Sequence, residues 1–135
     1  MHTLTDFTLR EEYRKVKKLG DRLAEVDSLI NWEEFRPIIG NMYKNNTEKG
    51  GRPNIDEIVM FKLLVLQQWH GLSDPELERQ VTDRISFRKF IGFPKSVPDF
   101  STVWSFRERL ARTGKDCELW KELQRQLDNR GLKVM

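Results

Sequence analysis

Side chains that bind zinc or form disulfides are scarce in this sequence, which has one cysteine, Cys117, and two histidines. A single cysteine cannot form a disulfide within the chain, and it excludes a zinc site built from several cysteines. Neither His2 nor His70 has a partner at metal-ligand spacing. We therefore expect no metal or cofactor, and we expect Cys117 to be a small, partly buried side chain rather than a nucleophile.

Targeting and membrane segments are also missing. The longest apolar run is interrupted by Lys62 and ends by Trp69, too short to span a bilayer. The first residues, MHTLTDFTLREE, become acidic and amphipathic at once, unlike a signal peptide. The segment GGRP lacks the lysine of a phosphate-binding loop. We expect a cytoplasmic protein with no membrane partner and no small-molecule substrate.

Signals for β-strands are absent as well, since no turn pair such as Asn-Gly separates two alternating runs. Apolar residues recur instead at spacings of three and four, as in amphipathic helices. We predict an all-α fold in which residues 1–135 form one domain of six or seven short helices. The helices are expected at residues 4–19 with a continuation over 23–30, then at 31–43, 55–70, 73–84, 86–92, 101–112 and 116–130.

The segment 55–70 is apolar on nearly every face, which predicts a central, buried helix. Asn54 and Glu57 have the spacing of a capping box at its start, and Ser73 is the expected N-cap of the following helix. Gly71 and Gly114 are expected helix ends. The predicted core contains Trp32, Phe35, Ile58, Phe61, Leu64, Val65, Leu77, Val81, Phe90, Phe106 and Leu110.

The N-terminal third leaves two questions open. Residues 44–54, KNNTEKGGRPN, are polar and predict a loop that could act as an internal hinge. Arg52 in this loop is a candidate contact to the DNA minor groove, although a loop whose Pro53 only sets up the start of the next helix is favoured. A seven-residue repeat of Leu9, Val16, Leu23 and Ile30 allows a short coiled coil, but three heptads are marginal, and a helix packed on its own core is favoured.

The net charge of +3 is concentrated near the C-terminus, where residues 101–135 carry 8 basic and 5 acidic groups. The segment 97–110, VPDFSTVWSFRERL, lies here. On a helical wheel, the core face of the expected helix 101–112 carries Val103, Phe106 and Leu110. A second face carries Thr102, Ser105, Arg109 and Arg112.

This second face has the chemistry of a DNA contact. Hydroxyl groups and helix N-termini bind phosphate oxygens, and arginines bind phosphates or guanine edges. The helix at 73–84 would support it in a helix-turn-helix-like pair, although the connection exceeds the usual turn of three or four residues. The alternative is a solvated surface helix with incidental arginines.

The order of motifs resembles the N-terminal domain of InsH-like transposases of insertion sequences. The matching segments are VDSLINWEEFRPIIGNMY, GGRPNIDEIVMFKLLVLQQWHGLSDPELERQVTDRISFRKFIGF, VPDFSTVWSFRERL and ELQRQLDNRGL. Each is weak alone, but together, in this order and spacing, they are specific. The resemblance runs from about residue 19 to the end.

This resemblance implies a DNA-binding role in transposition, at the terminal inverted repeats of the element. The implied partners are double-stranded DNA and a second copy of the chain or the full-length transposase. The family's chemistry is performed by three carboxylates of a ribonuclease-H-like domain, and no position of this sequence matches any of them. We therefore expect no catalysis by this chain alone. The alternative is a helical protein–protein module that dimerises without touching DNA.

Overall fold

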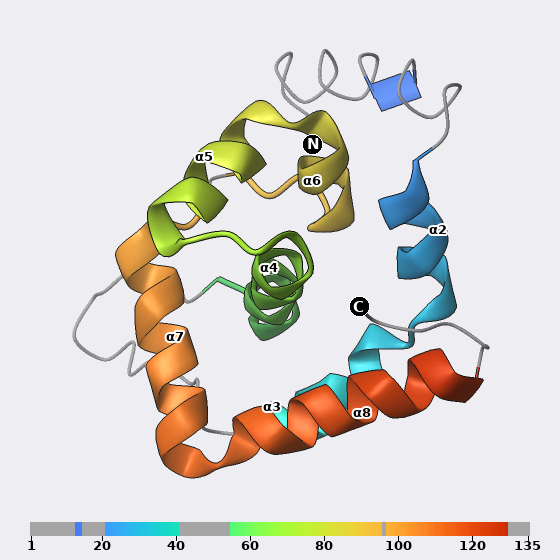
Figure 1. Ribbon diagram of the computed structural model, residues 1–135, viewed down its shortest axis with the longest axis vertical. Helices are drawn as coiled ribbons and strands as arrows, with labels where there is room; N and C mark the ends of the chain where they lie inside the picture. Colours follow the sequence, from blue (N-terminus) through green and yellow to red (C-terminus); the bar gives the residue numbers. More distant parts are fainter. Residues whose placement is uncertain (1–12, 15–20, 41–54, 96, 130–135) are drawn as a thin grey trace.

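A computed structural model describes residues 13–14, 21–40, 55–95 and 97–129 (Figure 1). These residues form seven α-helices, one 3-10 helix and no strand, which confirms the all-α prediction. Arg52 and the predicted hinge at 44–54 lie outside the described residues, as does most of the predicted helix 4–19. In the described part, no helix is long and apolar enough to cross a bilayer.

The elements follow the predicted order closely. They are α2 (Arg22–Leu29), the 3-10 helix η1 (Trp32–Phe35), α3 (Arg36–Ile39), α4 (Glu57–His70), α5 (Asp74–Asp83), α6 (Ile85–Phe90), α7 (Phe100–Thr113) and α8 (Lys115–Asn129). The predicted single helix over 31–43 is wrong, because its described part divides into η1 and α3. Pro37 stands in the first turn of α3, where a missing N–H group costs nothing.

Helix α4 is the centre of the molecule, as its all-round apolar sequence predicts. Figure 1 shows α4 end-on, with α5 and α7 along one side and α8 below it. Seven of its side chains are buried, from Ile58 to Leu66. It ends at Gly71, whose φ of 61° lies in the left-handed region that glycine adopts without strain.

The predicted capping box of α4 is wrong. The N-cap residue is Asp56 rather than Asn54, and its side chain makes no capping hydrogen bond. Glu57 instead accepts a hydrogen bond of 3.0 Å from Nη1 of Arg36. The same guanidinium binds Asp56 at 2.6 and 2.9 Å and also contacts Glu33. The start of α4 is thus fixed by a tertiary ion-pair cluster, which local spacing does not reveal.

The predicted core is confirmed at every position except Trp32, which is half-buried. Its ring packs at the edge of the core, and Nε1 donates a hydrogen bond of 2.6 Å to Asp27 at the surface. Leu23 and Ile30 pack against the same core. That contact fits the favoured interpretation of the heptad repeat, a helix packed on the chain's own core. The first two positions of the repeat, Leu9 and Val16, lie outside the described residues.

Helix α8 closes the core with one apolar stripe, in which Leu119, Leu123 and Leu127 are buried. Lys115 and Gln126 tie it to the N-terminal half: Lys115 Nζ donates to the carbonyl of Ile38 at 3.0 Å, and Gln126 Oε1 accepts from the amide of Asn31 at 2.7 Å. The expectation that Cys117 is partly buried is wrong. Cys117 is two positions before the buried Leu119, which places it on the opposite side of α8, and it is exposed.

Candidate nucleic-acid interface

Helix α7 is anchored by one face and exposed on the other, as predicted. Val103, Phe106 and Leu110 are all buried, and the helix packs on α4, α5 and α8. It begins one residue earlier than expected, at Phe100, because Asp99 is its N-cap. Gly114 ends it in the left-handed conformation, with a φ of 72°.

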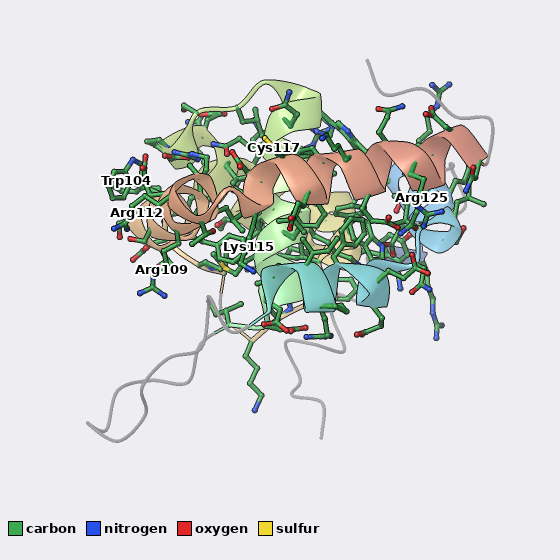
Figure 2. The ribbon with its side chains drawn as sticks, turned by 90° about the horizontal axis from the view of Figure 1, so that it is seen from below. Trp104, Arg109, Arg112, Lys115, Cys117 and Arg125 are labelled. Carbon is green, nitrogen blue, oxygen red and sulfur yellow. The ribbon has the colours of Figure 1, made fainter. Side chains whose placement is uncertain are left out.

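The exposed face carries most of the residues predicted to contact DNA. Ser105, Arg109 and Arg112 are exposed, whereas Thr102 is half-buried. Figure 2 shows Trp104, Arg112 and Arg109 projecting outward from α7 at one end of the molecule, while Arg125 lies toward the other end of α8. The structure thus brings Ser105, Arg109 and Arg112 together on one surface. Arg52 lies outside the described residues.

The N-terminus of α7 is occupied by protein carboxylates. Asp99 Oδ1 accepts hydrogen bonds from the Thr102 amide at 2.8 Å and from the Ser101 hydroxyl at 2.9 Å. Glu78 of α5 accepts from the Phe100 amide at 2.9 Å. The pKa of Asp99 is lowered, first by the backbone hydrogen bond from Thr102. Two carboxylates at this helix end disfavour a phosphate there, so the expected phosphate contact through the helix terminus does not fit the geometry.

The three arginines of α7 have different environments. Arg107 points toward α5, with Nη1 2.6 Å and Nη2 2.7 Å from the two carboxylate oxygens of Asp74. This hydrogen-bonded pair lowers the pKa of Asp74 and raises that of Arg107. Arg109 and Arg112 form no ion pair with any described residue. Their charges are therefore free to attract a polyanion.

Helices α5 and α7 pack against each other, as the supporting and recognition helices of a DNA-binding pair do. Ser73 caps α5 as predicted, accepting a hydrogen bond of 3.3 Å from the Glu76 amide. The connection between α5 and α7 contains the whole of α6 and the loop after it. This pair therefore differs from a simple helix-turn-helix, whose turn has three or four residues.

Two exposed aromatic side chains on α7 were missed as site residues. Phe100 and Trp104 are each 49% exposed, and in the described part of the chain no other large hydrophobic side chain is exposed. A signal was present in the sequence for Trp104, which falls outside the spacing of the core positions Val103, Phe106 and Leu110, but not for Phe100, which continues that spacing. That spacing placed Trp104 between the two faces. Whether another helix covers its ring depends on the tertiary packing, which the spacing does not reveal.

Two carboxylates far from α7 share one arginine as a structural partner. Glu34 and Glu122 bind Arg125 at 3.0 and 2.6 Å, and the pKa of Glu122 is lowered to about 2, chiefly by its hydrogen bond with Arg125. Over the described ranges, no three His, Cys, Asp or Glu side chains gather as a metal-ligand group. On the outward face of α7, by contrast, Arg109 and Arg112 have no carboxylate partner among the described residues.

Comparison with known proteins bears on this surface. The family model described as "Transposase domain (DUF772)" matches residues 10–109. The match includes α7 as far as Arg109 and stops short of Arg112. No solved structure matches the chain.

Proposed function

Since the chain belongs to this transposase domain family, we propose that it is the DNA-binding module of an insertion-sequence transposase and that it recognises the terminal inverted repeats of the element. The observation that supports this proposal most directly is the outward face of α7. There, Arg109 and Arg112 are exposed, and neither has a carboxylate partner among the described residues. An unpaired cationic face on a firmly anchored helix suits the phosphate backbone of DNA.

In the proposed complex, α7 lies in the major groove with its C-terminal half close to a phosphate backbone. Arg112, in the last turn, contacts a phosphate. Arg109, one turn earlier, reaches a base edge, where a guanidinium binds guanine through two hydrogen bonds. Ser105 lies on the same exposed face and adds a hydroxyl contact. The carboxylates of Asp99 and Glu78 keep the N-terminal end of α7 away from the backbone.

The proposal assigns binding rather than chemistry to these residues. The sequence carries no position equivalent to the three metal-binding carboxylates implied by the resemblance. We accordingly propose that the chain alone neither cuts nor joins DNA, and that it brings a transposon end to a second copy or to the full-length transposase. Metal-dependent nicking of DNA by a pure preparation would contradict this part.

The test is a gel-shift titration across a salt series, comparing duplexes that carry the element's terminal repeat with duplexes of shuffled sequence. We expect preference for the repeat and an affinity that falls steeply as salt rises. The double variant Arg109→Ala/Arg112→Ala should bind weakly at every salt concentration. A matched control, Arg79→Ala/Arg125→Ala, removes the same charge from exposed positions on α5 and α8 and should bind like the parent. Equal binding by both double variants would refute the proposed surface.

A second candidate function is a protein–protein module, which the exposed Phe100 and Trp104 favour. This function predicts that copies of the chain associate with one another as the protein concentration rises, and that Trp104→Ala abolishes this association. It also predicts that the chain prefers no DNA duplex over another. Sedimentation of the parent and this variant without DNA separates it from the first proposal.

A further inference from the structure

Phe100 and Trp104, here called the aromatic pair, lie one turn apart on α7, on the side of the helix next to the start of α5. They are four positions apart in the sequence, so they are neighbours on one side of the helix. Each keeps 49% of its surface exposed, although burying such a ring normally stabilises a folded protein by a few kcal/mol. An adjacent pair of exposed rings is typical of a contact surface rather than of scattered surface residues.

The aromatic pair borders a pocket of about 530 Å³ between the start of α5 and the start of α7. Its walls are formed by Ser73, Asp74, Pro75, Phe100, Ser101 and Trp104. The polar groups among them are already engaged. Ser73 caps α5, Ser101 donates to Asp99, and Asp74 is bound by Arg107 and by Gln67 Nε2 at 2.6 Å.

The pocket therefore offers apolar contact and little unused hydrogen-bonding capacity. The positive charge of Arg107 compensates the negative charge of Asp74. The pocket wall formed by Asp74 therefore does not repel a polyanion as a free carboxylate would. The chemistry suits an uncharged apolar group presented at the edge of a larger ligand.

The position of the pair near the arginines suggests that this larger ligand is the proposed DNA. Trp104 projects from the same end of the molecule as Arg109 and Arg112 (Figure 2). A recognition helix usually touches base edges with its N-terminal residues, which is where the aromatic pair lies. Asp99 and Glu78, at the first turn, disfavour phosphates there and leave the base edges as the neighbouring part of DNA. In the major groove, the apolar group on a base edge is the C5-methyl of thymine.

We infer that Phe100 and Trp104 are specificity-determining residues that contact thymine methyl groups in the major groove. This inference rests on the proposed DNA-binding function and adds to it a preference for A·T pairs beneath the first two turns of α7. Arg109 and Arg112 supply attraction to the backbone and a guanine contact, whereas the aromatic pair discriminates among the remaining bases.

The experiment begins by selecting duplexes that the parent chain binds from a pool with a randomised core. Thymine at each selected A·T pair is then replaced by deoxyuridine, which removes only the methyl group. We expect the parent to lose about fourfold in affinity at each contacted position, the value of one buried methyl-sized group of about 0.8 kcal/mol. Trp104→Ala should bind thymine and deoxyuridine duplexes equally well at the position that Trp104 contacts, and should keep the discrimination at the position that Phe100 contacts. Arg112→Ala should bind both more weakly and keep the fourfold ratio.

Tryptophan fluorescence gives a second readout that does not depend on affinity. Adding a selected duplex should quench the emission of the parent more than that of Trp104→Phe, because the other three tryptophans lie outside the proposed contact. Circular dichroism of Trp104→Ala should match the parent, since the ring is half exposed. Trp104→Gln serves as a second variant if the alanine variant folds poorly.

The outcomes separate the two proposals. Binding to selected duplexes with no response to methyl removal at any position would overturn this inference and leave the proposed function intact. No binding to any duplex would refute the proposed function itself. In a third outcome, the parent chain associates without DNA in a concentration-dependent way that Trp104→Ala abolishes. That result would show that the aromatic pair contacts a second copy of the chain, and it would overturn the inference of a thymine contact.

Discussion

Arg107 and Asp74 form a two-point ion pair that joins α7 to α5, with nitrogen–oxygen distances of 2.6 and 2.7 Å. Nη1 of Arg107 also lies 3.0 Å from Oε1 of Gln67 in α4. One side chain thus holds three helices at the point where the outward face of α7 begins. It adds a polar connection to the apolar contacts of Val103, Phe106 and Leu110 that anchor α7 on the core.

Arg107→Ala should destabilise the fold by about 1.5–3 kcal/mol, because it removes hydrogen bonds between charged groups and leaves a largely buried carboxylate unpaired. Arg107→Lys should recover only part of this, since lysine cannot make the two-point contact. The measurement is chemical denaturation, with the exposed Arg109→Ala as a control that changes stability by less than about 0.5 kcal/mol. Equal stability of the two alanine variants would contradict the proposed role.

The same pair predicts a dependence of stability on pH. The pKa of Asp74 is lowered on folding, so the folded state favours the ionised carboxylate. This contribution is present above the ordinary value of 3.8 and is lost as the pH falls through the lowered value. Asp74→Asn should therefore be less stable than the parent at pH 7, and the gap should narrow toward about pH 2. A gap that stays constant over this range would refute the prediction.

Leu64→Ala should cost about 2–5 kcal/mol, because Leu64 is buried in the central helix α4 and its removal leaves a cavity. Gln68→Ala, one turn later at an exposed position of α4, is the matched control. Denaturant unfolding of both variants tests the central position of this helix. A loss below about 1 kcal/mol for Leu64→Ala would mean that α4 is peripheral.

Asp99 allows its capping role and its charge to be separated. Asp99→Ala should destabilise α7 and lower the melting temperature, whereas Asp99→Asn should retain most of the cap. Because Asp99→Asn also removes a negative charge beside the proposed DNA surface, it should tighten duplex binding by about two- to fivefold at low salt. Thermal unfolding and gel shift measure the two effects. Weaker DNA binding by Asp99→Asn would indicate that the carboxylate contacts the ligand directly.

Arg109 and Arg112 should respond differently to substitution if α7 lies in the major groove. Arg112→Ala, which removes a phosphate contact, should weaken binding to all duplexes alike and lower the salt slope by about one. Arg109→Ala should cost about 1–3 kcal/mol on the preferred duplex and relax the preference at one position. Binding of both variants at parental strength across the salt series would exclude α7 as the contact helix.

Some features of the site could be predicted from local sequence alone. The spacing of Val103, Phe106 and Leu110 identified the buried face of α7, because a helix with 3.6 residues per turn brings these positions together. The exposure of Ser105, Arg109 and Arg112 followed from the same periodicity. Gly114 marked the helix end, since glycine readily adopts a left-handed conformation.

The partners of charged groups could not be predicted in this way. Periodicity places Arg107 nearer the core face than Arg109 and Arg112, but it does not reveal that Arg107 meets Asp74 or that the other two have no carboxylate partner among the described residues. Asp74 lies 33 positions earlier, and only the packing of α5 on α7 brings the two together. The same packing puts Glu78 at the start of α7, which removes the free helix terminus that the sequence suggested.

By itself, the sequence determined the all-α class, the central place of α4 and the two-faced character of α7, because these depend on periodicity along a single segment. The tertiary structure decided which cations remain unpaired, which aromatic rings stay uncovered and which helix end is already occupied. Those outcomes depend on distances between residues that are far apart in the chain. The local sequence around a residue does not reveal which residues it contacts in the folded protein.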